Sequence, residues 1–289
     1  MQVQRGAHDT RRTEQRLAFQ TTVNIHLAML PSHNTKHLPL LRFPFVNSTF
    51  YLAQRDDGIC NGTALWLAGQ CLALYFAEHH VPTYPPRPRA IELGSGVGLT
   101  AWVLRQFNAV SIRSQLKINN RLALASLGWD VLATDIDLVI SSVLSNNIRA
   151  NLAQLPEHSG RVEVHELDWL VSPAEWKWDI ASNPPYDLIY AADTIYKSEL
   201  VEPLLRTIHA LSTLSRSSSA PPRSPLILLC IERRDPPLVD RLLDDARNIW
   251  NFSVERIPRK RLSKALDKHG AQWDNADWEG IELWKLRLN

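Results

Sequence analysis

The stretch Ile91-Glu-Leu-Gly-Ser-Gly-Val-Gly98 decides how this chain folds. A short apolar strand, residues 90–93, runs into a glycine-rich turn that is expected to open a helix. Glycine permits a tight turn and a close approach to a ligand, because it has no Cβ. The spacing is G-x-G-x-G, unlike the G-x-G-x-x-G of dinucleotide-binding loops. It suits a small nucleoside ligand with an amino-acid tail over the loop; a tight turn without a ligand is the alternative.

Strand and helix patterns alternate on both sides of this loop. Apolar or alternating runs predict strands at 90–93, 131–134, 161–167, 187–192, 226–231, 252–257 and 281–288, and a strand or hairpin at 43–53. Helical spacing predicts helices at 62–79, 137–152, 198–214 and 237–250, with Ser198 as the N-cap of the third. Alternating strands and helices predict an α/β fold, with a mostly parallel sheet and helices on both faces.

The length and composition predict one large domain. The chain has 289 residues, of which 45% are hydrophobic. We expect residues 1–38 to form a disordered extension, residues 39–289 to form the domain, 81–89 to be a proline-rich linker and 215–225 to be a mobile loop. Residues 102–121 interrupt a predicted helix. The helical spacing is restored when residues 98–101 are joined directly to residues 122–128. We interpret them as an insertion, either a gene-model artefact or a surface excursion.

The charge and cysteine content argue against several classes of protein. A net charge of +2 does not favour a nucleic-acid partner. Cys60, Cys71 and Cys230 form no C-x-x-C pair, so we expect reduced thiols and neither disulfides nor a metal site. No apolar run is long enough for a membrane span. We expect a monomeric cytoplasmic protein, with the nucleus as the alternative compartment.

Asp135 ends the strand that follows the glycine loop. In Rossmann-like folds an acidic residue at this place binds ribose hydroxyls. A carboxylate that accepts from two vicinal hydroxyls makes charge-assisted hydrogen bonds, which are stronger than neutral ones. The alternative is that Asp135 caps the following helix.

Four further segments carry a family resemblance. Gly62-Thr-Ala-Leu-Trp66 opens a predicted helix, and Leu167-Asp-Trp169 and Ala191-Ala-Asp-Thr-Ile-Tyr196 end predicted strands. The fourth segment, residues 199–205, is an acidic and apolar helix start that contains Pro203-Leu-Leu205. Together with the glycine loop they resemble methyltransferase family 16, seven-stranded protein-lysine methyltransferase-like proteins, over residues 46–288. The resemblance implies a Rossmann-like sheet with an antiparallel closing strand. It also implies a protein substrate, such as a translation factor, a chaperone or an AAA-type ATPase.

The resemblance implies S-adenosylmethionine as the cofactor and assigns a role to each matching position. Asp193 and Tyr196 match an Asp-x-x-Tyr motif beside the transferred methyl and the incoming lysine. The positions that match cofactor contacts are Trp66, Gly94, Ser95, Gly96, Asp135, Trp169 and Ala192. The alternatives are that the two tryptophans only pack in the core and that Asp193 only caps a helix.

The chemistry of lysine methylation agrees with these residue types. A lysine with a pKa near ~10.4 must be neutral to attack the methyl, which costs about 4.6 kcal/mol at pH 7. Asp193 can accept a hydrogen bond from the amine and orient it, and Tyr196 can bound the pocket. Aromatic rings favour the positive charge of the sulfonium.

Two other functions compete with this interpretation. Asn183-Pro-Pro-Tyr186 matches the motif of methyltransferases that act on nucleobase amines or glutamine amides. Those motifs follow a strand, whereas this one precedes the strand predicted at 187–192, away from the ligand edge of the sheet. The second competitor is a binding module without catalysis, against which the intact Asp135 and Asp193 argue.

Overall fold

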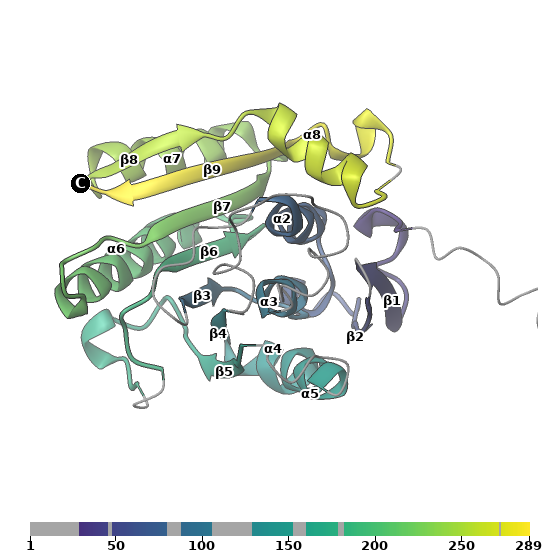
Figure 1. Ribbon diagram of the computed structural model, residues 1–289, viewed down its shortest axis with the longest axis horizontal. Helices are drawn as coiled ribbons and strands as arrows, with labels where there is room; N and C mark the ends of the chain where they lie inside the picture. Colours follow the sequence, from purple (N-terminus) through teal and green to yellow (C-terminus); the bar gives the residue numbers. More distant parts are fainter. Residues whose placement is uncertain are drawn as a thin grey trace, which may run out of the picture.

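The chain folds around one seven-stranded sheet. The computed structural model describes residues 29–45, 48–79, 88–105, 129–152, 160–178, 182–271 and 273–289 (Figure 1). The strand order is β5-β4-β3-β6-β7-β9-β8, and β9 runs opposite to the other six strands. The predicted Rossmann-like α/β fold is therefore confirmed. The strands are β3 (Arg89–Leu93), β4 (Asp130–Asp135), β5 (Val162–Glu166), β6 (Leu188–Ala192), β7 (Leu226–Glu232), β8 (Phe252–Arg256) and β9 (Ile281–Leu288).

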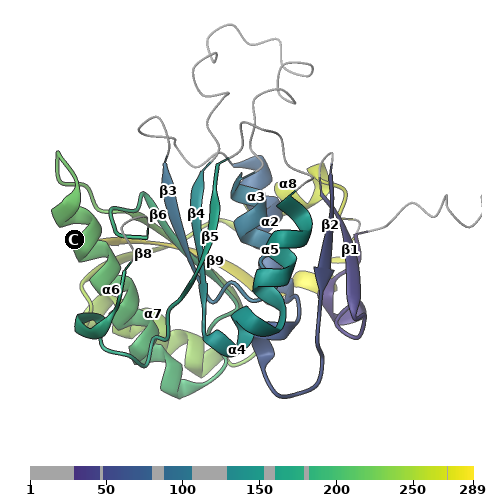
Figure 2. The same cartoon turned by 90° about the horizontal axis from the view of Figure 1, so that it is seen from below.

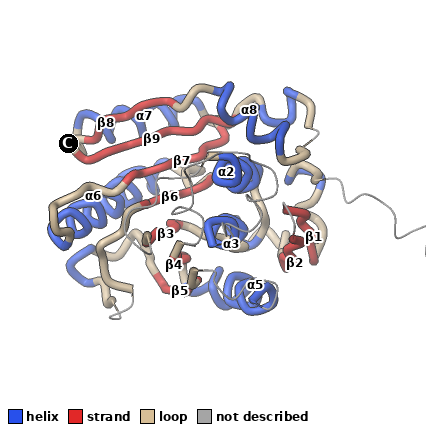
Figure 3. Tube along the Cα trace, in the orientation of Figure 1, coloured by secondary structure: helices blue, strands red, loops and turns tan. Residues whose placement is uncertain are grey.

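Helices cover both faces of the sheet (Figure 2; the same layers are drawn as a tube in Figure 3). One face packs against α6 (Val201–Ser218) and α7 (Pro236–Asn248). The other packs against α2 (Leu67–Glu78), α3 (Leu99–Arg105), α8 (Arg259–Lys268) and a continuous helix made of α4 (Asp137–Val139), the π-turn η4 (Ile140–Leu144) and α5 (Ser145–Asn151). The sequence pattern did not predict α8. No helix in the described part of the chain is long and apolar enough to cross a bilayer.

A hairpin extends the second of these layers. Strands β1 (Leu40–Phe45) and β2 (Ser48–Ala53) pair antiparallel, which confirms the hairpin expected near 43–53. Asn151 accepts from Tyr51 N at 2.9 Å and donates to Tyr51 O at 2.8 Å, and Asn147 makes the same pair of bonds with Ala53. The two amides thus take the place of a neighbouring strand along the edge of β2.

The glycine loop owes its glycines to the protein around it. Gly94 and Gly96 have φ of +69° and +55°, which side chains rarely adopt. A Cβ on Gly94 would lie 2.9 Å from Thr194 Cγ2, and one on Gly96 would lie 3.0 Å from the carbonyl oxygen of Gly62. The sequence interpretation allowed either the approach of a ligand or a tight turn without one; close packing of neighbouring loops is sufficient to require these glycines.

Residues 62–66 do not open α2, contrary to the prediction. Asn61–Thr63 form a 3-10 turn (η3), and the helix begins only at Leu67. The Thr63 hydroxyl lies 2.6 Å from Arg55 O and 2.7 Å from Cys60 O, either of which can accept its proton, and Leu65 N donates to Gln54 Oε1 at 2.8 Å. These bonds hold the chain extended where the apolar spacing alone favours a helix.

The predicted boundaries also shift. Met29 is buried, and its carbonyl oxygen accepts from Trp273 Nε1 at 2.5 Å, so the fold includes part of the segment 1–38 that was expected to be disordered. Arg89 belongs to β3 rather than to a linker. Trp102 is a buried residue of α3, stacked on Phe50 at 6.2 Å, so the helix does not stop where the insertion was placed. The remainder of these three segments, 1–28, 81–87 and 106–121, lies outside the described residues.

Helix α6 differs from its prediction at both ends. It is preceded by a 3-10 turn (η7, Ser198–Leu200), whose N-cap is Lys197 rather than Ser198. It continues through Ser218, so the first four residues of the loop predicted at 215–225 are helical. Ser215 is buried, and its Oγ accepts from Tyr186 N at 3.0 Å.

We therefore expect Ser215→Ala to destabilise the protein. The substitution leaves the buried Tyr186 N–H without its acceptor, which costs about 1–3 kcal/mol. Ser217→Ala is the matched control, because Ser217 is exposed on the same helix and donates only to Thr213 O. Chemical denaturation measures both variants. Equal stability of the two would show that Ser215 contributes no more than a surface serine.

Candidate functional site

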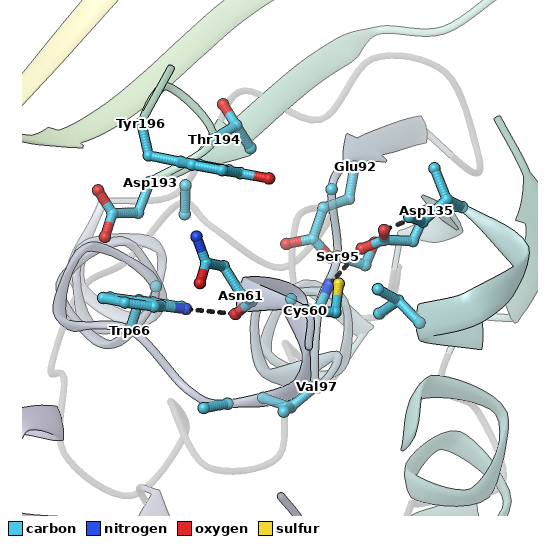
Figure 4. Close-up of a pocket in the computed structure, with 18 of the residues that line it drawn as sticks. Cys60, Asn61, Trp66, Glu92, Ser95, Val97, Asp135, Asp193, Thr194 and Tyr196 are labelled. Carbon is cyan, nitrogen blue, oxygen red and sulfur yellow. Dashed lines mark hydrogen bonds between the residues drawn. The ribbon is translucent and has the colours of Figure 1, made fainter. Parts of the chain in front are cut away.

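A cavity of about 290 Å³ opens at the carboxyl ends of β3, β4 and β6. Parallel strands bring their carboxyl ends to one edge of the sheet, where ligands of open α/β folds bind. All nine residues that the sequence singled out as candidates line this cavity, and Figure 4 shows five of them with their neighbours. They are Trp66, Gly94, Ser95, Gly96, Asp135, Trp169, Ala192, Asp193 and Tyr196.

Asp135 joins the glycine loop to β4. Its Oδ2 accepts from Gly96 N and its Oδ1 from Ile136 N, both at 2.9 Å. Each oxygen keeps a further lone pair for a ligand hydroxyl. Burial raises the pKa of Asp135 to about 6, and the two main-chain bonds oppose this rise. Asp135 is not the N-cap of α4, because Ile136 occupies that position.

Two tryptophans contribute to the lining. Trp66 is the N-cap residue of α2, and its Nε1 donates to Asn61 O at 2.7 Å. Trp169 packs against the Cα of Gly94, and its buried Nε1 has no hydrogen-bond acceptor among the described residues. This N–H is a donor that a ligand in the cavity can satisfy.

Glu92 is a lining residue that the sequence interpretation missed. It is fully buried on β3, accepts from the hydroxyl of Thr100 and lies 3.4 Å from Tyr190 Oη. Burial raises the pKa of Glu92 to about 8. A charged residue between Ile91 and Leu93 in an apolar strand was the signal that could have identified it, because an acidic residue is rarely buried without a partner.

Asp193 has the most unusual environment in the site. It follows β6 with a φ of +56°, and its carboxylate is only 1% exposed. Arg234 donates to Oδ2, and Glu232 N lies 3.4 Å from Oδ1. Burial raises the pKa of Asp193, whereas Arg234 lowers it. The alternative that Asp193 caps the following helix is wrong, because Lys197 and Leu200 hold the N-cap positions of η7 and α6.

Cations and aromatic rings surround this carboxylate. The Arg234 guanidinium carbon lies 4.7 Å from the centre of the Trp66 ring, and Lys36 Nζ lies 3.5 Å from it. Tyr196, three residues after Asp193, is 45% exposed, and Figure 4 shows its ring extending over the cavity from the same loop. Neither Arg234 nor Lys36 was a sequence candidate. Arg234 follows the carboxyl end of β7, so the strand-end rule that found Asp193 applies to it as well.

The competing motif lies elsewhere. Asn183-Pro-Pro-Tyr186 precedes β6, at the opposite end of the strand from Asp193. Tyr186 is buried and donates to Ser182 O, and Arg89 donates to Asn183 O. None of the four residues of the motif lines the cavity.

Comparison with known proteins identifies the family. The model of the lysine methyltransferase family matches residues 49–237. The chain belongs to this family. Mouse protein-lysine methyltransferase METTL21E is 29% identical over 178 residues, and mouse protein N-lysine methyltransferase METTL21A is 28% identical over 177.

These alignments are partial. Each covers 60% of this chain, and they span 60% and 65% of the lengths of METTL21E and METTL21A. Among solved structures, the human methyltransferase 10 domain containing protein aligns with a TM-score of 0.38 and 11% identity, over 77% of this chain and 82% of its own.

As a member of the lysine methyltransferase family, the chain uses S-adenosylmethionine as its cofactor. The lining of the cavity fits that molecule. Asp135 offers carboxylate oxygens for a ribose diol, and Trp169 offers a buried indole N–H that has no acceptor in the described part of the chain. The cofactor also carries a sulfonium cation, which suits the aromatic and carboxylate groups of Trp66 and Asp193.

Proposed function

We propose that this chain is a protein-lysine N-methyltransferase, which transfers a methyl group to the side-chain amine of a lysine. The buried carboxylate of Asp193 in the lining of the cavity carries the proposal, because it provides an acceptor that can orient an amine. The family membership and the names of the relatives support a lysine acceptor. We further propose a protein substrate, a monomeric enzyme and a cytoplasmic or nuclear location.

The residues at the two ends of the cavity have different roles in this proposal. Asp135, with Gly94, Ser95, Gly96, Trp169 and Ala192, binds the cofactor, which supplies an electrophilic methyl group on its sulfonium. Trp66, which lines the cavity beside Arg234, also contacts the cofactor and shields the reacting atoms from water, and exclusion of water strengthens the electrostatic interactions inside the site.

At the acceptor end, the amine must arrive neutral and in line with the methyl. Asp193 accepts an N–H hydrogen bond from the amine and fixes the direction of its lone pair. Tyr196 bounds the opening through which the side chain enters. After transfer the nitrogen carries a positive charge, and its surplus proton passes to water at the open mouth.

The experiment that tests the proposal is a labelling reaction. A cell lysate is incubated with the purified protein and S-adenosylmethionine labelled in its methyl group, and the labelled protein is digested and sequenced by mass spectrometry. We expect N-methyllysine, and much weaker labelling with Asp193→Asn. Label on a nucleobase or a glutamine amide would overturn the lysine proposal. Absence of cofactor binding in a calorimetric titration would favour a binding module instead.

Asn183→Ala separates the lysine acceptor from the nucleobase or glutamine alternative. We expect the variant to keep the turnover of the wild type within a factor of about two, because the exposed Asn183 side chain does not line the cavity. Methylation of free DNA or tRNA by the wild type, abolished by this substitution, would establish the alternative. The measurement is the initial rate of label transfer at saturating cofactor.

A further inference from the structure

The proposed role of Asp193 carries an electrostatic difficulty. A carboxylate within about 4–6 Å of an amine favours the charged form of that amine and raises its pKa. An ammonium ion has no lone pair and cannot accept a methyl group. A lone buried carboxylate at this position would therefore orient the lysine and at the same time keep it unreactive.

Arg234 resolves this difficulty by its position. Its guanidinium donates to the Asp193 carboxylate and stacks over Trp66, with 42% of the side chain exposed. Arginine remains protonated at every pH at which proteins fold. The pair thus presents an oxygen that accepts a hydrogen bond, while the charges of carboxylate and guanidinium cancel.

We propose that Arg234 keeps the incoming lysine in its neutral, nucleophilic form by cancelling the charge of Asp193. This inference rests on the lysine acceptor proposed above. Arg234 acts through Asp193 and through its field, so it is a positioning residue rather than a catalytic one. The transfer itself is unchanged: the amine nitrogen forms a bond to the methyl carbon, the carbon–sulfur bond breaks, and one proton leaves the nitrogen.

The other ionisable groups near Asp193 and Arg234 do not neutralise the charge of Asp193, so Arg234 does. Glu232 Oε2 lies 3.6 Å from Arg234 Nε, and Lys36 Nζ lies over Trp66, so a second anion and a second cation offset each other. Burial raises the pKa of the Cys71, Cys230 and Tyr196 side chains, which are therefore neutral near pH 7. Cys60, Glu92 and Asp135 line the remainder of the cavity, and Asp56 acts on Lys36 from the hairpin side.

The pKa of Lys36 depends on the electrostatic field of Arg234 near the Trp66 ring. Desolvation lowers the pKa of Lys36, and the charge of Arg234 is the next largest cause. The amine of Lys36 shares the Trp66 ring with Arg234, so it is a built-in probe that needs no external acceptor.

The first test titrates Lys36 in the full chain. Its reactivity toward acetic anhydride is measured by mass spectrometry as a function of pH in the wild type, Arg234→Met, Arg234→Lys and Arg241→Met. We expect the midpoint to rise in Arg234→Met and to stay low in Arg234→Lys, which keeps the charge. Arg241 is exposed and pairs with Asp245, so Arg241→Met should leave the midpoint unchanged. An unchanged midpoint in Arg234→Met overturns the proposal, whether or not a protein acceptor is known.

The second test measures kcat/KM against pH with the protein that the lysate labelling identifies. The rate rises with pH as the acceptor amine loses its proton. We expect Arg234→Met to move this rise upward by about one pH unit or more, which at pH 7 slows transfer about tenfold or more. The difference should shrink at high pH, where the amine is neutral in both proteins. A loss of equal size at every pH would mean that Arg234 has only a structural role.

A double variant tests whether the net charge of the pair sets the pKa of the acceptor amine. Asp193→Asn combined with Arg234→Met has no net charge at the pair, as in the wild type. We expect the rise in kcat/KM to return toward the pH of the wild type, although turnover stays low without the carboxylate. Melting temperature and cofactor affinity are measured for every variant. If kcat/KM of the double variant rises at the same shifted pH as that of Arg234→Met, charge cancellation is not the cause of the shift.

Discussion

Asp193→Asn is expected to lower turnover by roughly 10²-fold or more while the protein keeps its fold and much of its affinity for the cofactor. Asparagine tolerates positive φ better than most residues, so it fits the backbone at +56°. The amide has nearly the volume of the carboxylate and can still accept from Glu232 N. It loses the charge that binds Arg234 and orients the acceptor amine.

The measurement separates chemistry from binding. Single-turnover rates of methyl transfer report the chemical step, and calorimetry reports the dissociation constant of the cofactor. Tyr196→Phe is the companion variant, and we expect a smaller loss because Tyr196 is half exposed and only its hydroxyl is removed. A fully active Asp193→Asn enzyme would remove the main reason for a lysine acceptor and would direct attention to Asn183.

Asp135→Ala is expected to weaken binding of S-adenosylmethionine. Loss of a charge-assisted pair of hydrogen bonds to the ribose costs about 1.5–3 kcal/mol, which is roughly 10- to 150-fold in the dissociation constant. Gly96 N also loses its acceptor, so the loop that faces the cofactor is loosened. An unchanged dissociation constant would mean that Asp135 only fastens the loop.

The raised pKa of Asp135 adds a pH dependence with a definite sign. Its folded pKa, about 6, lies above the ordinary value, so the carboxyl group takes up a proton as the pH falls through this value. A protonated carboxyl accepts hydroxyl hydrogen bonds more weakly, and affinity should fall by up to about tenfold per pH unit below pH 6. Asp135→Ala should lack this dependence, which calorimetry between pH 5 and pH 8 can establish. An equal pH dependence in the variant would assign the titration to a group other than Asp135.

Local rules fail where distant groups compete for the backbone. The apolar spacing from Gly62 favours a helix, yet Gln54 holds Leu65 N and delays the helix to Leu67. The polar run at Ser215 is typical of a loop, yet Ser215 is buried in α6 and binds Tyr186. In both cases the partner lies outside the window that a local pattern samples.

What the sequence determined by itself is the sheet and the edge at which the candidate residues meet. Apolar runs mark the strands, and parallel strands in an α/β fold send their carboxyl ends to one side, so Gly94, Asp135 and Asp193 had to converge. This argument needs only the order of strands and helices along the chain, which local hydrophobicity encodes.

The tertiary structure alone decided the charges around Asp193. Lys36 reaches Trp66 from a segment that the sequence assigned to a disordered extension, and Arg234 approaches from the end of a neighbouring strand. Neither contact leaves a periodic or compositional trace, because a single long side chain can point in several directions from its backbone position. Which direction it takes depends on burial and on the charge of groups far away in the chain, and these exist only once the sheet and its loops are assembled.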